Sequence, residues 1–493
     1  MSSSNQRLPT SDKNKITRIK ERLLELNAFD KYPSTDIGAA QLFSDVFKDQ
    51  CRYNSTAGEW FHYNGKIWGI DRGGLFARSA AKDLSRALAL YAPDAARTDQ
   101  ELRSFLDYAK KWTSARFRNY VIQDSRDAYF FDNEQMDIDD YILNMQNGVL
   151  VLDEKKAVFK PHDAGMLLSR IGNASYDPTA KCERWEKFLL EIMQEDVGKV
   201  RYLQKLFGLC LTGDVRLEKM WFLYGSSTRN GKSTLLETIS YVLGTYAETI
   251  RPETLAIKNN PDSRTASPDI AKLSGARLVV CSEPPKRMSL DTGLIKNLTG
   301  RDVITARFLH QCEFRFIPKF KIICNTNYLP ITTDTTVFTS GRIQVISFEK
   351  HFCENEQDKT LKTKLQSDEA LSAILNWCID GWLLFCKEGL EPPEAIQSST
   401  KEYADNSDKI QNFINDCLEK SDTNVSIKDA YDRYGEWCKD NGFFCENKRN
   451  FVDEIKNKRI FSDRGMVGGK QVRNIIRGYD FAFTDMEDSL PFD

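Results

Sequence analysis

The clearest alternation of apolar and polar positions lies near the middle of the chain. Residues 220–224 form an unbroken apolar run of strand type, and a polar loop follows from Gly225 to Gly231. Apolar residues then return at the 3.6-residue spacing of a helix, which ends at Gly244. These positions predict a strand, a loop and a helix in direct succession.

Short apolar runs rich in β-branched residues recur after this helix. They cover 278–281, 320–324 and 343–348, and helical patterns separate them. A helical stretch over 182–211 precedes the first strand. Buried strands that alternate with helices are typical of a mainly parallel sheet covered on both faces. We therefore predict an α/β core over residues 181–352.

The residues before this core predict a separate α+β domain over 39–180. Alternation over 60–68 around Asn64-Gly65 predicts a hairpin, because this dipeptide suits a two-residue turn. Helical patterns follow over 75–91 and 99–120, and 146–152 is again strand-like. Residues 1–38 are mostly polar, and we expect them to form a flexible tail.

The residues after the core predict a helical segment and linker over 353–408, where Glu391-Pro392-Pro393-Glu394 marks a shift in composition. Three helical patterns and two strand-like pieces then indicate a winged-helix domain over 409–486, with a tail at 487–493. Residues 446–477 contain nine Lys or Arg against four Asp or Glu. This region is either a solvated charged face or a contact for nucleic acid through the third helix and wing.

Composition narrows the classes of protein that this chain can be. The 493 residues include 69 Lys plus Arg against 71 Asp plus Glu, so any DNA contact must come from local basic surfaces. Twelve scattered cysteines lack a C-x-x-C pair, which argues against a zinc ribbon and favours a reducing compartment. No signal peptide or long apolar run is visible. We expect a cytoplasmic protein with no membrane contact.

The central loop has the composition of a phosphate cradle. Backbone N–H groups at a glycine loop and at a helix N-terminus attract an anion, Lys232 adds a point charge, and the Ser233 hydroxyl can ligate Mg²⁺. Five residues separate Gly225 from Gly231, where four are usual. Either Ser226 takes the first-glycine position or the loop is one residue longer. The predicted ATP-binding residues are Gly225, Ser226, Ser227, Thr228, Arg229, Asn230, Gly231, Lys232, Ser233 and Thr234.

ATP hydrolysis also needs an acid, a polar sensor and a positive charge near the phosphoryl group. Glu283 follows a predicted strand, where a carboxylate reaches the phosphate edge of a parallel sheet. Asn327 is the candidate sensor, and Asn325 is its rival. Arg342 precedes the last strand and could complete the site of a neighbouring subunit.

A predicted hairpin between the acid and the sensor is rich in arginine and aromatic residues. Such a hairpin can contact a nucleic-acid backbone and stack on bases, or it can simply extend the sheet. The candidate DNA-binding residues are Arg307, His310, Gln311 and Arg315.

The order of these stretches resembles the superfamily 3 helicases, in particular the poxvirus-like phage and plasmid primase-helicase family. The matching stretches are GSSTRNGKST, LVVCSE, LTGRDVITARFLHQ, FKIICNTNYLP and SGRIQVISF. Upstream, WFHYNGKIWGID, LNMQNGVLVLD and YLQKLFGLCLTGD are similar to the helicase-associated N-terminal domain of that family. The resemblance covers about residues 40 to 485, including the winged-helix module.

The resemblance implies an AAA+ P-loop core in a hexameric ring that hydrolyses ATP with Mg²⁺. Such a ring translocates 3′ to 5′ on single-stranded DNA and opens forked duplex during replication of a phage or mobile genetic element. It implies that Lys232 and Ser233 hold phosphate and Mg²⁺, that Glu283 is the catalytic acid beside the metal, that Asn327 is the sensor, and that Arg342 is donated to the adjacent subunit. A primase or loader is a further possible partner, although no primase domain is visible.

Two other functions remain open from the residues themselves. One is a replication initiator whose ATPase only switches its affinity for origin DNA. The other is an NTPase or kinase that acts on a small molecule, which would need neither the arginine-rich hairpin nor a donated arginine.

Overall fold

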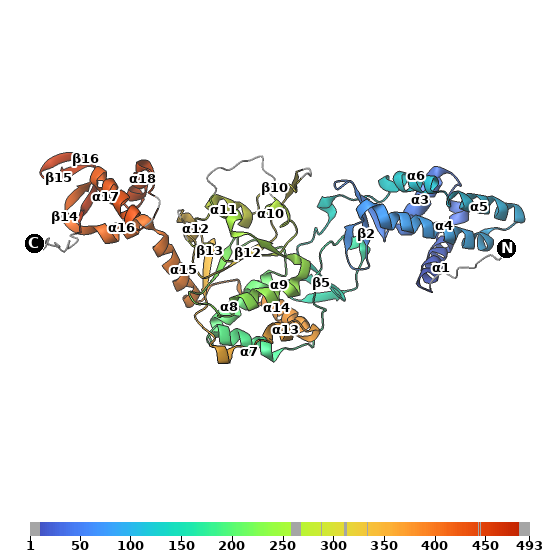
Figure 1. The fold of residues 1–493 in the computed structure, drawn as a ribbon, viewed down its shortest axis with the longest axis horizontal. Coiled ribbons are helices and arrows are strands. Elements are labelled where there is room, and N and C mark those ends of the chain that lie inside the picture. Colours follow the sequence, from blue (N-terminus) through green and yellow to red (C-terminus); the bar gives the residue numbers. More distant parts are fainter. Residues whose placement is uncertain are drawn as a thin grey trace, which may run out of the picture.

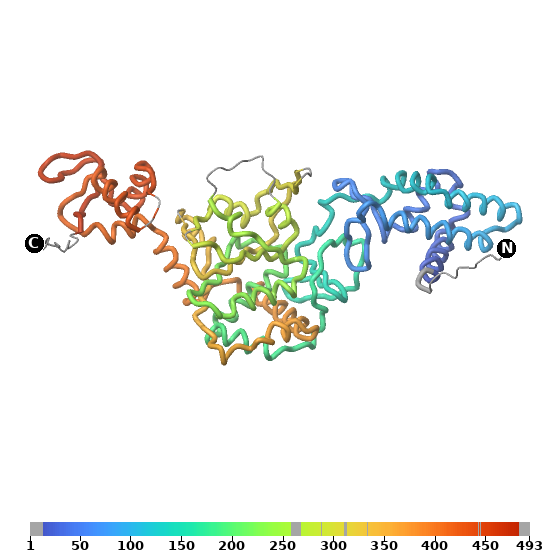
Figure 2. Tube along the Cα trace, viewed as in Figure 1, coloured from blue at the N-terminus to red at the C-terminus, as the bar shows by residue number. Residues whose placement is uncertain are grey.

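The computed structural model describes residues 10–257, 268–286, 288–309, 313–332, 334–441, 443 and 445–482. Figure 1 shows an elongated molecule in which an N-terminal lobe, a central lobe and a C-terminal lobe follow one another along the long axis. The tube in Figure 2 shows the blue N-terminal lobe and the red C-terminal lobe at opposite ends of the molecule.

The central lobe is built on a five-stranded sheet whose paired strands are all parallel. The sheet has the order β13-β7-β12-β9-β8. Its strands are β7 (Met220–Tyr224), β8 (Ala247–Ile250), β9 (Leu278–Cys281), β12 (Lys321–Thr326) and β13 (Ile343–Ser347). The prediction of a mixed α/β core with a parallel sheet is confirmed.

Helices cover both faces of this sheet. Trp221 and Leu223 of β7 pack into one hydrophobic core, and Met220 and Phe222 pack into a second core on the other face. This explains why β7 is a continuous apolar run instead of an alternating one. The helices of the central lobe are α7 (Glu183–Ile192), α8 (Val197–Leu209), α9 (Lys232–Leu243), α10 (Pro268–Ala271), α11 (Thr292–Thr299), α12 (Thr336–Thr339), α13 (Leu361–Leu365), α14 (Asp368–Glu388) and α15 (Glu394–Ser407).

Helices α8 and α14 cross at very short range in the first core. A Cβ atom added at Gly208 would lie 2.1 Å from the backbone nitrogen of Trp382, and one at Gly381 would lie 2.0 Å from the carbonyl oxygen of Gln204. Among the described residues, α14 is also the one helix that is long and apolar enough to cross a membrane, but 61% of its apolar window is buried. We therefore treat α14 as a core helix.

The N-terminal lobe joins helices to a small antiparallel sheet. Its elements are α1 (Thr10–Glu25), α2 (Ala28–Lys31), α3 (Asp36–Phe47), β1 (Cys51–Asn54), β2 (Glu59–Tyr63), β3 (Trp68–Ile70), α4 (Leu75–Ala95), α5 (Asp99–Lys111) and α6 (Ala115–Asp124). A second antiparallel sheet follows, made of β4 (Ile142–Met145), β5 (Gly148–Leu152) and β6 (Ala157–Lys160). Leu143 and Leu150 of this sheet join the core of the central lobe.

Two expectations about flexible or continuous segments are wrong. The expected tail over 1–38 forms helices from Thr10 onward, because Ile16, Ile19 and Leu23 are buried in the N-terminal core. The helical segment expected over 353–408 is present and includes α15, whose Tyr403 packs against Phe222 and Phe338. The expected single helix over 99–120 breaks between α5 and α6.

The C-terminal lobe has its own hydrophobic core and is reached through α15. Its elements are α16 (Lys409–Cys417), β14 (Leu418–Ser426), α17 (Ile427–Asp440), α18 (Lys448–Asn457), β15 (Phe461–Val467) and β16 (Lys470–Phe481). The sheet order is β14-β16-β15, so the last two strands form a hairpin against β14. Strand β14 was not expected from the sequence.

Candidate nucleotide-binding site

The parallel register gathers the predicted site residues, apart from Arg342 and those of the hairpin, at one edge of the central sheet. Tyr224 pairs with Thr326 and Ser347, and Cys281 pairs with Cys324. The loop after β7, Glu283 after β9 and Asn327 after β12 therefore leave the sheet at the same carboxyl edge. This is the edge at which open α/β sheets bind ligands.

The loop from Gly225 to Gly231 needs glycine at both ends. A Cβ atom at Gly225 would lie 2.3 Å from Nδ2 of Asn230, 2.7 Å from the carbonyl oxygen of Phe348 and 2.9 Å from Nζ of Lys232. Gly231 has a φ of 85°, and a Cβ atom there would lie 2.3 Å from Ile192. The close-packed first glycine is thus Gly225, and five residues lie between the two glycines.

Lys232 is the first residue of α9, and its ammonium group is buried. Only 3% of the residue is exposed, and Nζ donates to the carbonyl oxygen of Gly225 at 3.2 Å and to Oδ1 of Asn327 at 2.9 Å. Burial lowers the pKa of Lys232 to about 8, although attraction to Glu283 acts to raise it. Both hydrogen-bond acceptors are neutral, and no side chain caps the N-terminus of α9. An anion at this position would therefore stabilise both groups.

The two candidate sensor residues have different partners. Asn327 binds Lys232, whereas Asn325 donates from Nδ2 to Oγ of Ser233 at 3.0 Å. Both asparagines thus reach the start of α9 from β12. The sequence left them as rivals, but the structure places both at the site.

Glu283 is exposed at the edge of the site, two residues beyond β9. Its carboxylate is close enough to act on the pKa of Lys232. Ser233 and Glu283 are an oxygen pair of the kind that Mg²⁺ accepts together with phosphate and water. These side chains therefore fit the metal that the resemblance implies.

We expect nucleotide binding to take up protons above neutral pH. With a pKa of about 8, Lys232 is increasingly neutral as the pH rises, whereas bound phosphate would favour its charged form. Uptake should reach about 0.5 proton per site at pH 8, and affinity should fall roughly tenfold per pH unit well above it. Calorimetric titration with nucleotide in buffers of different ionisation enthalpy measures this uptake. Lys232→Arg should remove it, because arginine stays charged; equal uptake in that variant would assign the proton elsewhere.

A segment that sequence reasoning did not identify supports the loop from outside. Nδ1 of His351 lies 2.8 Å from the carbonyl oxygen of Thr228, and the backbone N–H of Phe352 donates to Arg229 at 2.9 Å. Arg229 itself has a φ of 58°. No short motif marks these contacts, because they join residues more than 120 positions apart.

A hollow of about 280 Å³ lies beside the loop. Its walls come from the start of the loop, the end of β13 and the side of α15. The α15 residues are Ser399, Glu402, Tyr403 and Asn406. Because α15 continues into the C-terminal lobe, the wall of this hollow connects the loop with that lobe.

Arg342 lies at the opposite edge of the sheet from Lys232. Its carbonyl oxygen accepts from the N–H of Met220, the first residue of β7. Nη2 donates to Glu218 at 2.7 Å, and Nη1 donates to Thr299 at 2.8 Å. The structure therefore does not bring Arg342 to the loop of its own chain.

The predicted hairpin consists of β10 (Ile304–Ala306) and β11 (Phe314–Phe316). Arg315 pairs with Thr305 and is exposed, and Arg307 directly follows β10. The Phe308 and Phe314 rings stack at 5.9 Å at the end of the hairpin where Ala306 pairs with Phe314. His310 and Gln311 lie outside the described residues.

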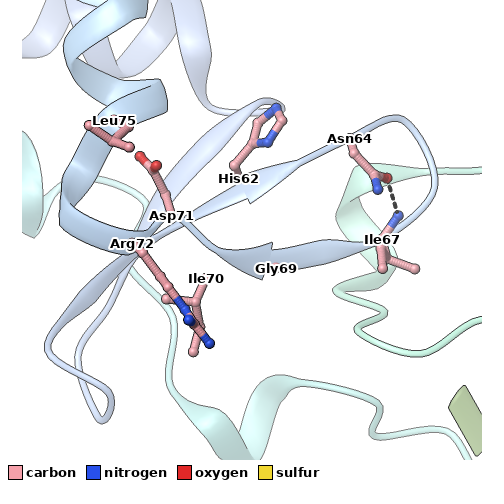
Figure 3. A pocket seen from close by; sticks show the side chains of 8 residues that line it. All are labelled: His62, Asn64, Ile67, Gly69, Ile70, Asp71, Arg72 and Leu75. Atoms are coloured by element: carbon pink, nitrogen blue, oxygen red, sulfur yellow. Dashed lines mark hydrogen bonds between the residues drawn. The ribbon is translucent and has the colours of Figure 1, made fainter.

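A second hollow, of about 370 Å³, lies in the N-terminal lobe (Figure 3). Hairpin β2–β3 and the start of α4 form it. The carboxylate of Asp71 accepts from the N–H groups of Phe76 and Ala77, and the His62 ring stacks on Phe76 at 3.7 Å. These polar groups stabilise the start of α4, so we assign no ligand to this hollow.

Comparisons with known proteins match three parts of the chain. Residues 40–194 match a family described as D5 N terminal like, residues 223–342 match a family of unknown function, and residues 405–474 match a family described as poxvirus D5 protein-like. A candidate helicase of Acanthamoeba polyphaga mimivirus is 28% identical over 71% of this chain. A candidate primase of African swine fever virus is 21% identical over 68%. The chain spans 38% of the length of each of these two relatives.

Among solved structures, the C-terminal region of NrS-1 matches 68% of this chain and 96% of its own. The identity is 11% and the TM-score is 0.39.

Proposed function

We propose that this chain, whose residues 40–194 and 405–474 match D5-like families, is an ATP-dependent DNA helicase that acts in replication of a phage or other mobile genetic element. In this proposal identical subunits form a hexameric AAA+ ring that moves 3′ to 5′ on single-stranded DNA. Strand β7, its loop and α9 serve as the P-loop unit.

One observation carries the proposal: Lys232 is a buried ammonium group whose hydrogen-bond acceptors are both neutral. A buried cation without an anionic acceptor is costly, so such a position is maintained where a ligand supplies the negative charge. The uncapped N-terminus of α9 points to the same class of ligand, a phosphate. The glycine at 225 leaves room for Lys232 to fold back beside the loop.

In this proposal, each side chain at the carboxyl edge of the sheet has a separate role in ATP hydrolysis. Lys232 binds the terminal phosphates, and Glu283 orients the attacking water and accepts its proton. Asn327 positions Lys232 through its carbonyl oxygen, which leaves its amide N–H groups for a phosphate oxygen or the water. Ser233 and Glu283 would hold Mg²⁺, which when bound neutralises charge on the phosphates. Asn325 orients the Ser233 hydroxyl.

The position of Arg342 supports a site shared between subunits. An arginine at the opposite edge of the sheet cannot reach the loop of its own chain without refolding β13. In a ring, the amino edge of one sheet can face the carboxyl edge of the next, and Arg342 can then act as the finger.

DNA contacts are assigned to the β10–β11 hairpin and to the C-terminal lobe. Arg307, Arg315 and the stacked Phe308 and Phe314 suit a single strand inside a ring. The order of helices and strands in the C-terminal lobe supports a winged helix, with α18 and the β15–β16 hairpin on the DNA side.

The test is unwinding of a forked duplex by the purified chain with ATP and Mg²⁺. We expect strand separation that depends on a 3′ single-stranded arm. An initiator would hydrolyse ATP and bind duplex without separating strands, and a small-molecule kinase would be indifferent to DNA. Either result would reject the helicase.

The β15–β16 hairpin, which we call the wing, has two arginines that face each other. Arg464 pairs with Arg473 across β15 and β16, and both are exposed. Like charges directly opposite are destabilising, so DNA phosphate between them would relieve the repulsion. We expect Arg473→Glu to weaken duplex binding at least tenfold, by about 1.4 kcal/mol, while basal ATPase is retained. The same variant should unfold at an equal or higher temperature. Unchanged duplex binding would remove the wing from the DNA contact.

A further inference from the structure

A second basic surface lies at the far end of the molecule from the winged-helix-like lobe. Helices α5 and α6 meet there in a tight corner, which we call the α5–α6 corner and define as residues 103–120. Between residues 103 and 118 the chain has five cations and one acid, Asp107. The cations are Arg103, Lys110, Lys111, Arg116 and Arg118. The whole chain, by contrast, has a net charge of −2.

The cations of the corner are not neutralised by the protein. In residues 10–257 and the other described parts of the chain, none of the five forms an ion pair with a carboxylate. Arg103, Lys110, Lys111 and Arg116 are exposed, and Arg118 is half-buried. Elsewhere in the same lobe, Lys20, Arg86 and Arg97 do have acidic partners. The corner therefore combines several cations without acidic partners in one short stretch of the chain.

The corner is rigid, because Trp112 anchors the turn. Trp112 is fully buried, and its ring lies edge-on to Tyr108 and Phe117 at 6.4 and 5.6 Å. Nη1 of Arg118 donates to the carbonyl oxygen of Trp112 at 2.6 Å. A rigid base keeps the exposed cations together, so a ligand does not have to order them.

An exposed aromatic ring lies beside one of these cations, Arg116. Tyr120 is 50% exposed, and the guanidinium of Arg116 lies 5.6 Å from the centre of its ring. Nε of Arg116 donates to the Tyr120 hydroxyl at 3.1 Å. A ring next to clustered cations is suited to a base beside its phosphates.

We propose that the α5–α6 corner is a binding site for the backbone of single-stranded nucleic acid. This inference rests on the proposed helicase function and extends it, since it assigns a DNA contact to the N-terminal lobe. Clustered cations on a near-neutral protein bind a polyanion by releasing its counterions. The α5–α6 corner and the wing then contact nucleic acid at opposite ends of the molecule.

The test compares two triple variants of the full chain. The first variant reverses the charge of three cations of the corner and is Lys110→Glu/Lys111→Glu/Arg116→Glu. The control reverses the charge of three exposed lysines outside the corner and is Lys82→Glu/Lys155→Glu/Lys156→Glu. Both variants change the net charge equally. Fluorescence anisotropy measures the affinity for labelled single-stranded DNA from low to moderate salt.

We expect the corner variant to bind at least tenfold more weakly than the control at low salt. Its slope of log affinity against log salt should be shallower by about 2, since each lost phosphate contact on a single strand removes about 0.7. Basal ATPase without DNA should be the same in both variants. Equal affinities and slopes in the two variants would overturn the inference. A second contrary result would be that polyglutamate and unlabelled DNA displace labelled DNA from the wild type equally well. If the wild type bound no DNA, the helicase proposal itself would fail, which is a distinguishable result.

Discussion

Lys232→Ala is expected to abolish ATP turnover, with a loss of about a thousand-fold or more, because the ammonium group supplies the fixed charge on the transferring phosphoryl group. The same change should not unfold the protein. Burial lowers the pKa of Lys232, which means that its charge is costly in the folded state without nucleotide. Lys232→Met, which keeps most of the side-chain volume, should therefore leave the free energy of unfolding unchanged or raise it.

Turnover and thermal unfolding measured together separate a catalytic role from a structural one. Lys205→Met is the matched control, since Lys205 is also a buried lysine but pairs with Glu388 at 3.7 Å, away from the loop. This control should keep turnover. If Lys232→Ala retained turnover, the nucleotide site would have to lie elsewhere.

Arg342→Ala is expected to bind nucleotide normally but to lose about a thousand-fold in turnover, as an arginine finger does. In its own chain Arg342 is about 13 Å from the loop, because the length of β7 separates the two edges at about 3.3 Å per residue. We therefore expect Arg342 to act on the site of another copy.

Mixing inactive variants tests this directly. Arg342→Ala subunits have an intact loop, and Lys232→Ala subunits have an intact arginine. In rings mixed at random in equal amounts, about a quarter of the junctions join the two intact parts, so turnover should return to that fraction. Absence of any recovery would reject the shared site.

Glu218→Gln is the control for a structural role of Arg342. It removes the ion pair at 2.7 Å but leaves the guanidinium in place. If Arg342 acts as a finger, the Glu218→Gln variant should still hydrolyse ATP at the wild-type rate. If Glu218→Gln lost as much turnover as Arg342→Ala, the role of Arg342 would be structural, through its ion pair with Glu218, and not that of a finger.

Local patterns in the sequence were sufficient for the elements closest to the chemistry. The apolar run at 220–224, the glycine loop and the spacing of Leu235 to Leu243 correctly placed β7 and α9. Strand periodicity also located β9, β12 and β13. These features depend on residues that are neighbours in sequence, so propensity and spacing determine them. The order of the motifs was enough to predict the similarity to D5-like proteins that the family matches support.

Other elements of the fold depend on packing between residues that are distant in the sequence. The polar segment over 1–38 looked unstructured, yet α1 buries Ile16, Ile19 and Leu23 against the N-terminal core. A helical segment with a linker was predicted over 353–408, but the sequence did not show that Tyr403 attaches α15 to the central lobe through its hydroxyl, which donates to the carbonyl oxygen of Pro330 at 2.6 Å. Strand β14 was missed because its only partner, β16, begins more than 40 residues later.

By itself, the sequence determined which side chains can bind phosphate and in which order they occur. Only the tertiary structure decided that Asn327 holds Lys232 while Asn325 holds Ser233, and that Arg342 faces away from both. The physical reason is the parallel sheet: β7 lies between β12 and β13, which follow it by about a hundred residues. Strand order and register set which side chains meet, and neither is encoded in any short stretch of the chain.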